Sequence, residues 1–520
     1  MYRSVGLAAW KVACAVAVSV AVVLCVSGCA AFQSASRAAG TVLGLDAYYG
    51  QSVDWVPCGD GRTGEWFADT WAGVECGQVS APLDYRNVQQ HWSSGDQTVR
   101  LAVARRPATQ DKTGTLLVIS GGPGGTGLDL IEAAYPPEVL AHFDVVAYDP
   151  RGVGRSTPLI QCAGGLDPDL DLSAADTEAV EAAERTEVEA CMADTGLDVL
   201  RHTGSDEATN DVDLLRAVLG EERINLLAYS YGTQIAAMYA LRFPGNYRTA
   251  ILDGVVDIAE RPNDMRLGQE RGYQATFTRL AAFCAGEYRR GGAECPLGID
   301  PATAEATFQQ LLRDADARPA HVRGGSPVTA IDVLDASYTG LLWPSAWKPY
   351  LAALQAFRLG DGTAVRRLAD FQDSEGTNAI TAITCTDTAD PTTDRAARQH
   401  DAAARYDAAT YDNYEPRPTE FPLEDCDLWP FEGKVIPGEL LPVVPARADS
   451  AARLLFVGTR HDPTTPLGNA ERMAEYMTSP LLVREGDGHV VVFGDENDCI
   501  DAEVIRYLDD PDSVRDKTCA

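Results

Sequence analysis

Short apolar runs that alternate with amphipathic segments are the feature of this 520-residue sequence that most restricts its fold. Each run has the length of a strand and ends at glycine, aspartate or proline, which is typical of strands buried in a parallel sheet. Between two runs, residues 206–219 place their apolar side chains on one helical face, as a crossover helix does. We therefore expect an α/β fold with a mostly parallel sheet flanked by helices. The expected strands are residues 115–120, 143–148, 224–229, 250–253, 453–458 and 481–484, with residues 99–105 at the sheet edge.

The alternation stops over residues 256–445, where alanine, arginine and aspartate recur at helical spacing. We interpret this segment as a helical cap inserted into the α/β core, because two proline-rich runs near its end resemble a linker that returns to the sheet. The expected units are a signal peptide at residues 1–28, a tether at 29–50, a first core part at 51–255, the cap at 256–445 and a second core part at 446–520.

Ser230 lies between an apolar run and a helical segment, in the sequence Ala228-Tyr229-Ser230-Tyr231-Gly232. A serine in a sharp turn between strand and helix is typical of a nucleophile elbow, where small flanking residues let the two backbones approach closely. Gly232 is one such residue, and Ala228 stands where the motif more often has glycine. We expect Ser230 to act as a nucleophile.

A serine hydroxyl needs a base that takes its proton and an acid that orients the base. The last part of the chain offers both, because Asp462 and His489 each follow a predicted strand and complete the order Ser, Asp, His. We therefore predict a catalytic triad of Ser230, Asp462 and His489. His461 is the rival base and Asp253 the rival acid.

The glycine-rich residues 120–127 follow the first buried run and let the main chain approach a substrate closely. Acyl transfer needs backbone N–H groups aimed at the oxygen on which negative charge develops. We assign these oxyanion donors to the amides of Gly122 and Tyr231. A phosphate-binding loop is the alternative, but the stretch lacks the lysine and hydroxyl residue of a P-loop.

The start of the sequence predicts export. Basic residues precede an apolar run that ends at Val26-Ser27-Gly28-Cys29, which resembles a bacterial lipobox. In this interpretation Cys29 carries a lipid that anchors the exported protein to the cell membrane, on the side of the cell envelope. A transmembrane anchor is the alternative, although the run is shorter than the about 20 apolar residues that span a bilayer.

Ten of the 13 cysteines lie beyond the signal peptide and its cleavage point. An even number of dispersed cysteines in an exported protein predicts disulfides, and pairing between sequence neighbours is the simplest of the connectivities that the sequence leaves open. There is no Cys-x-x-Cys pair and no His-Glu-x-x-His, so we expect no metal. The ten cysteines are Cys58, Cys76, Cys162, Cys191, Cys284, Cys295, Cys385, Cys426, Cys499 and Cys519.

The net charge of −33 argues against nucleic acid as a partner, because phosphate binding needs clustered lysine and arginine that the sequence does not supply. An acidic, solvated surface keeps an exported protein soluble. We expect a monomer that needs no cofactor.

Together these motifs resemble the secreted tripeptidyl and prolyl aminopeptidases of actinobacteria, which are α/β-hydrolases with a C-terminal TAP-like domain. The resemblance covers residues 55–519 and rests on the Gly-Pro turn at 121–124, the Asp-x-Arg-Gly-x-Gly-x-Ser segment at 149–156, the elbow at 229–233 and the two loops of the acid and the base. The lipobox and cysteine layout are most similar to those of mycobacterial cell-envelope lipoproteins with serine protease and esterase activity. The resemblance implies the triad named above, no metal, and a cap that restricts access.

Such enzymes release tripeptides or single residues from peptide N-termini through an acyl-enzyme, and they need a carboxylate that holds the α-amine. Asp387, close to Cys385 in the cap, is our candidate for that carboxylate. A carboxylesterase or lipase acting on ester substrates is the alternative, because the motif does not distinguish amides from esters. A binding protein built on the same shell is a third possibility, although such proteins usually lose a triad member.

Overall fold

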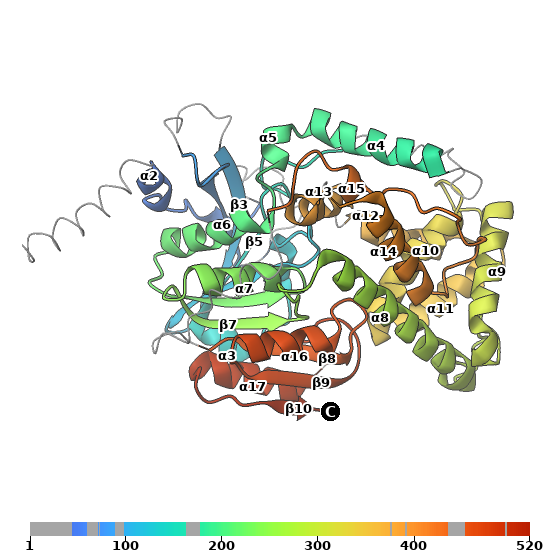
Figure 1. The fold of residues 1–520 in the computed structure, drawn as a ribbon. Coiled ribbons are helices and arrows are strands. Elements are labelled where there is room, and N and C mark those ends of the chain that lie inside the picture. Colours follow the sequence, from blue (N-terminus) through green and yellow to red (C-terminus); the bar gives the residue numbers. More distant parts are fainter. Residues whose placement is uncertain are drawn as a thin grey trace, which may run out of the picture.

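The computed structural model describes residues 44–59, 71, 73–88, 98–162, 177–374, 377–390, 393–434, 453–494 and 497–520. In this part the chain forms an α/β core and a helical cap (Figure 1). The predicted signal peptide, Cys29 and most of the predicted tether lie outside the described residues. None of the helices described is long and apolar enough to cross a membrane.

A mixed sheet organises the core, and the predicted α/β class is confirmed. Within the described residues the strand order is β1-β2-β3-β5-β4-β6-β7-β8-β9-β10, with parallel pairing from β5 to β10. The carboxyl ends of these parallel strands share one edge, where such sheets bind their ligands. The strands are β1 (Val56–Pro57), β2 (Glu75–Pro82), β3 (Thr98–Arg106), β4 (Gly114–Ile119), β5 (Phe143–Tyr148), β6 (Ile224–Tyr229), β7 (Tyr247–Asp253), β8 (Leu455–His461), β9 (Leu481–Asp487) and β10 (Lys517–Cys519).

The expectation that residues 99–105 form an edge strand is wrong. This segment is β3, which lies between β2 and β5, and its central residues from Leu101 to Ala104 are fully buried. The covering strand β2 has few large apolar side chains, so its sequence does not stand out as a strand. The alternation of polar and apolar residues in β3 comes from arginines near the two ends of the strand, which are not buried. It does not come from a position at the edge of the sheet.

Helices cover both faces of the sheet. On one face α2, α6, α7 and α16 close an apolar layer, and on the other face η1, α3 and α17 close a second layer. The crossover helix predicted for residues 206–219 is α6 (Ser205–Val218), which buries Val212 and Leu215. The other covering helices are α2 (Leu45–Tyr49), η1 (Leu128–Glu132), α3 (Pro137–His142), α7 (Gly232–Arg242), α16 (Leu467–Tyr476) and α17 (Asp498–Asp509).

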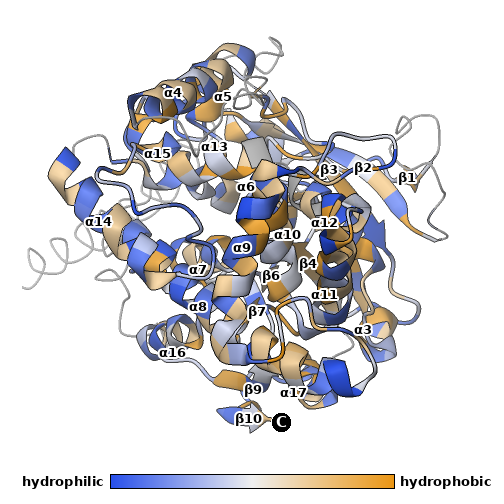
Figure 2. Cartoon of the chain, turned by 90° about the vertical axis from the view of Figure 1, so that its right-hand side faces the viewer, coloured by the Kyte–Doolittle hydropathy of each residue, from blue (hydrophilic) through white to orange (hydrophobic). Residues whose placement is uncertain are grey.

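The cap lies between β7 and β8 in the sequence and has an apolar core of its own, in which the rings of Phe277 and Tyr411 stack at 4.8 Å. Helix α14 alternates hydrophilic and hydrophobic residues and buries none of them completely (Figure 2). Two helices from the first core part join the cap, since α4 contacts α15 and α5 contacts α13. The helices are α4 (Thr177–Asp194), α5 (Leu197–Leu200), α8 (Pro262–Phe283), η2 (Cys284–Tyr288), η3 (Pro301–Thr303), α9 (Ala304–Ala317), α10 (Ala330–Leu342), α11 (Pro344–Arg358), α12 (Thr363–Ser374), α13 (Thr377–Thr388), α14 (Arg395–Ala408) and α15 (Asp425–Leu428).

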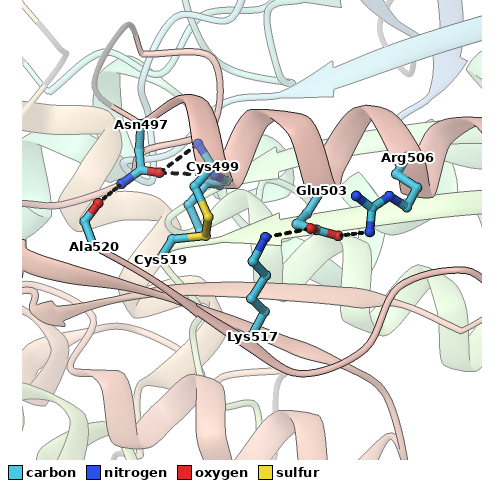
Figure 3. The surroundings of a disulfide bond; sticks show 8 residues. Asn497, Cys499, Glu503, Arg506, Lys517, Cys519 and Ala520 are labelled. Carbon is cyan, nitrogen blue, oxygen red and sulfur yellow. Dashed lines mark hydrogen bonds and ion pairs between the residues drawn. A yellow bond between two sulfur atoms is a disulfide. The ribbon is translucent and has the colours of Figure 1, made fainter.

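Each disulfide joins cysteines that are neighbours in the order of the sequence. The bond between Cys499 and Cys519 ties strand β10 to helix α17, next to an ion pair between Lys517 and Glu503 (Figure 3). Each crosslink therefore fixes a local segment of the chain. The pairs are Cys58–Cys76, Cys162–Cys191, Cys284–Cys295, Cys385–Cys426 and Cys499–Cys519.

Candidate active site

Ser230 occupies the sharp turn between β6 and α7. Its backbone φ is 52°, in the left-handed region that residues with a side chain rarely adopt. The Ser230 amide donates to the carbonyl oxygen of Asp253 on the neighbouring strand at 2.9 Å, which holds the turn. The side chain is partly exposed, so it is accessible to a substrate.

Small residues around Ser230 are required by close backbone contacts. A Cβ atom on Gly232 would lie 2.5 Å from the carbonyl oxygen of Ser120, and one on Gly121 would lie 2.8 Å from Cβ of Ser230. Ala228 is fully buried and pairs with Ile119 on one neighbouring strand. The methyl group at residue 228 therefore fits where many elbows have glycine.

Asp462 and His489 meet in two loops that follow β8 and β9. Nδ1 of His489 lies 2.8 Å from Oδ2 and 3.1 Å from Oδ1 of Asp462. The amides of Thr464 and Thr465 donate to Oδ1 of Asp462 at 2.8 and 2.9 Å. These bonds fix the carboxylate and aim it at the imidazole.

The electrostatic setting favours a charged imidazole. His489 is 6% exposed and Asp462 is 4% exposed. Burial alone would lower the pKa of His489, but the charge and the hydrogen bond of Asp462 outweigh it and raise that pKa above its usual value. An imidazolium formed during a reaction would therefore be stabilised at this position.

The rival base His461 and the rival acid Asp253 do not contact the Asp462–His489 pair through their side chains in the way that a triad member would. His461 is exposed at the end of β8, where it pairs with Asp487 of β9. Asp253 is fully buried at the end of β7, and its Oδ2 accepts the amides of Val491 and Val492, which follow His489. The structure therefore brings Asp462, and not Asp253, into hydrogen-bond distance of the His489 ring.

The amides proposed as oxyanion donors border the same turn. Within the described residues, neither the Gly122 amide nor the Tyr231 amide has an acceptor in the protein. The glycine loop is held by Asp149, whose Oδ1 accepts the amides of Gly127 and Leu128 at 2.9 and 3.0 Å. These two hydrogen bonds to the Asp149 carboxylate fix the conformation of the glycine loop.

Asp387 lies at the end of α13 and is 1% exposed. Its Oδ1 accepts the Ser205 amide at 2.8 Å, and its Oδ2 accepts the Tyr231 hydroxyl at 2.7 Å and the Gln234 amide group at 3.1 Å. Burial raises the pKa of Asp387 to about 6, although these donors oppose the rise. With these partners the carboxylate links the cap to the elbow.

Thr465 is a site residue that the sequence analysis missed. Its hydroxyl donates to Oδ2 of Asp462 at 2.9 Å and lies 3.2 Å from Nδ1 of His489. The available signal was Asp462-Pro463-Thr464-Thr465-Pro466, because an aspartate in such a turn bonds the residues that directly follow it and so brings the Thr465 hydroxyl near.

Two groups of side chains in the described part of the chain have a spacing that suits a metal ion, and neither contains a residue of this site. They are Asp84, His202 and Glu207, and Glu184, Glu187 and Asp425. In the first group Nζ of Lys434 lies 3.2 Å from Nδ1 of His202, so a cation is already present there.

Comparison with known proteins identifies the family. A model described as "alpha/beta hydrolase fold" matches residues 114–286, and one described as "TAP-like protein" matches residues 418–519. The resemblance to TAP-like hydrolases is thereby confirmed.

Curated relatives match most of the chain. Serine protease Hip1 of Mycobacterium tuberculosis is 33% identical over 88% of this chain and 89% of its own length. Carboxylesterase B of the same species is 32% identical over 87% and 88%, and tripeptidyl aminopeptidase of Streptomyces coelicolor is 28% identical over 90% and 86%. The chain belongs to the family of α/β-hydrolases with a C-terminal TAP-like domain, and it is a serine hydrolase of the peptidase or esterase kind.

Proposed function

We propose that this chain is an exported serine peptidase that works through Ser230, His489 and Asp462. Two observations carry the proposal: Ser230 lies in a left-handed turn after β6, and the buried His489 is held on Asp462 at 2.8 Å. Nucleophile, base and orienting acid each lie at the carboxyl end of a parallel strand, as acyl transfer on this fold requires.

The reaction follows from these roles. Ser230 Oγ attacks the scissile carbonyl carbon while Nε2 of His489 takes its proton, and the amides of Gly122 and Tyr231 stabilise the oxyanion. The C–N bond then breaks, His489 gives the proton to the leaving amine, and an acyl-enzyme remains. Water attacks the ester with His489 as base, which releases the acid and restores Ser230.

Two carboxylates in the cap favour a substrate with a free amine. Burial and the charge of Asp412 raise the pKa of Glu270 to about 7, and burial raises that of Asp412 to about 6. Neither carboxylate forms an ion pair with another described residue, because the nearby Arg266 and Arg405 both pair with Glu424. A substrate ammonium would supply the charge and the donors that these carboxylates lack.

These carboxylates lie on the side of the cap that packs against the acid loop. One turn after Glu270 on α8, the Tyr273 hydroxyl lies 3.2 Å from Oγ1 of Thr464. Arg266, Arg405 and Glu424, whose charges act on Glu270, line a cavity of about 430 Å³ together with Asp387, and this cavity offers room for a peptide. Asp387 accepts three hydrogen bonds from the protein, whereas neither Glu270 nor Asp412 has an ion-pair partner among the described residues, so we assign the α-amine to Glu270 and Asp412.

The test uses the protein from residue 30 onward with a tripeptidyl amide, the same peptide with a blocked amine, and a short-chain ester. We expect amide cleavage that is lost in Ser230→Ala, and a KM for the free amine that rises about tenfold or more in Glu270→Gln. Glu287→Gln, an exposed acid just after α8, is the matched control and should leave KM unchanged. An unaltered KM in Glu270→Gln would overturn the amine site, and activity in Ser230→Ala would overturn the nucleophile.

An esterase is the second candidate, because carboxylesterase B is 32% identical to this chain. Both functions use the same triad, and they differ in whether a substrate amine contributes to binding. Turnover of the ester alone, with no cleavage of either peptide, would establish the esterase and exclude the peptidase.

We also propose that Cys29 carries the lipid that anchors the exported protein to the cell membrane. The lipobox residues from Val26 to Cys29 support this proposal. Full-length protein expressed in a bacterium with radiolabelled palmitate should be labelled and should fractionate with the membrane. Cys29→Ala should lose both properties, and a labelled Cys29→Ala protein would overturn the assignment.

A further inference from the structure

Asp253 has a double contact with the candidate site. Its carbonyl oxygen accepts the Ser230 amide at 2.9 Å, and its Oδ2 accepts the amides of Val491 and Val492 at 2.6 and 2.7 Å. Main chain and side chain of one residue thus connect the nucleophile turn to the loop that carries His489.

The loop after His489 needs this support. Val490 and Phe493 have φ values of 54° and 57°, which are costly for side chains of this kind. Phe493 donates its amide to Asp501, and Val492 accepts the Tyr229 hydroxyl. Asp253 supplies the two bonds between these strained residues, so it holds the segment that fixes the position of the imidazole.

The two hydrogen bonds to the loop do not by themselves require a charged side chain at residue 253. An uncharged amide oxygen could accept the same two amides, yet Asp253 is a carboxylate whose buried Oδ1 has no hydrogen-bond partner among the described residues. The titratable groups facing it are His489, Asp462 and Tyr229. Of these, only His489 gains a positive charge in the reaction.

The His489 ring lies close to the end of the strand that carries Asp253. Gly254, directly after Asp253, has a φ of 70°, and a Cβ atom there would lie 2.9 Å from Cε1 of His489. Burial raises the pKa of Asp253 to about 6, while the Val492 and Val491 amides and His489 oppose the rise. Asp253 is therefore charged at neutral pH, and its charge adds to that of Asp462 in raising the pKa of His489.

We propose that Asp253 is a positioning residue that fixes the His489 loop relative to Ser230 and whose unpaired carboxylate stabilises the imidazolium formed when Ser230 loses its proton. Asp462 orients the ring, and Asp253 supports it from the neighbouring strand. This inference rests on the triad proposed above.

The test measures the rate at which a fluorophosphonate labels Ser230 as a function of pH. Labelling displaces fluoride from phosphorus with loss of the Ser230 proton to His489, so it does not depend on the natural substrate. Asp253→Asn keeps an acceptor for the two amides and removes the charge. We expect the acid limb of the profile to move about half to one unit lower in pH, because the imidazolium loses a stabilising charge.

Asp501→Asn is the matched control, since Asp501 bonds the same loop through Phe493, and its acid limb should stay in place. Asp253→Ser, which removes the charge with a shorter polar side chain, gives the same readout if Asp253→Asn does not fold. An acid limb at the parental pH in a folded Asp253 variant would overturn the electrostatic role. A parent protein that is not labelled at Ser230 would overturn the triad, and this inference with it.

Discussion

The core and the cap both contact the loop that carries His489, but the groups that reach the histidine differ. The core contributes charged side chains, because Asp462 bonds the His489 ring and Asp253 bonds the main chain after it. The cap contributes main-chain and aromatic contacts to His489 itself, since Leu342 accepts the His489 amide and Trp343 donates to the His489 carbonyl oxygen. Its charged contact, from Arg279, reaches Asp487 before the loop. The comparison teaches that the chemistry belongs to the core, whereas the geometry of the site depends on both units.

A substitution of Asp462, the proposed orienting acid, should have the largest effect, because it removes chemistry and not only geometry. We expect Asp462→Asn to lower kcat/KM by about 10⁴-fold, since the amide stabilises the wrong tautomer and no longer stabilises the imidazolium. His461→Gln, next to it and exposed, is the control and should keep parental activity. Comparable losses in the two variants would contradict the assignment of Asp462 as the acid.

A contact of the cap with the acid loop provides the second test. Gly272 on α8 faces Pro463, and a Cβ atom there would lie 2.2 Å from the Pro463 carbonyl oxygen. Because neither backbone can give way, Gly272→Ala should push helix and loop apart and lower kcat roughly 10- to 100-fold.

Gly268, about one turn earlier on α8, is a matched control, since its added Cβ would lie 3.8 Å from the Pro466 ring. Gly268→Ala should leave kcat unchanged and stabilise the helix by up to about 1 kcal/mol. Steady-state kinetics of both variants measures kcat, and thermal unfolding measures their stability. Equal kcat in the two variants would mean that the cap does not order the acid loop.

The sequence predicts the core well because its signals are local. Apolar runs mark the strands, and Ser230, Asp462 and His489 each follow such a run, so their convergence at one sheet edge follows from topology. The edge position of β3 was predicted wrongly because its covering strand β2 has little apolar signal of its own.

The contribution of the cap could not be predicted in the same way. Asp387 is separated from its partner Tyr231 by 156 residues and from Ser205 by 182. The sequence pattern carries no information on contacts between residues so far apart. From the sequence alone, an acid that links two units therefore cannot be distinguished from an acid that is free to bind a substrate. Glu270 is the reverse case, since only the three-dimensional arrangement leaves it without a basic partner among the described residues.

The bond between Asp387 and Tyr231 tests whether the cap orders the oxyanion hole. Tyr231→Phe removes the hydroxyl but keeps the amide proposed as an oxyanion donor. We expect the free energy of unfolding to fall by about 1–3 kcal/mol, since a buried carboxylate loses a donor, and kcat to fall about tenfold through displacement of the amide.

A double-mutant cycle with Asp387→Asn gives the control. If the two residues act through their mutual bond, the effects on kcat should be strongly non-additive. Independent effects that sum would contradict a link through this bond, and would confine Asp387 to the stability of the cap.

The smallest expected effect concerns the pH dependence of amine binding by Glu270. The pKa of Glu270 is raised to about 7, so the carboxyl is neutral below that pH and charged above it. An ammonium substrate binds the charged form, and KM for a free-amine peptide should therefore fall about fivefold as the pH rises from 6 to 7. The fall should end near pH 8, where the substrate amine itself begins to lose its proton. The N-blocked peptide should show no such dependence, and the free-amine peptide should lose it in Glu270→Gln. If both peptides showed the same pH dependence of KM, the cap would contribute geometry alone, and the core would have to account for any preference for a free N-terminus.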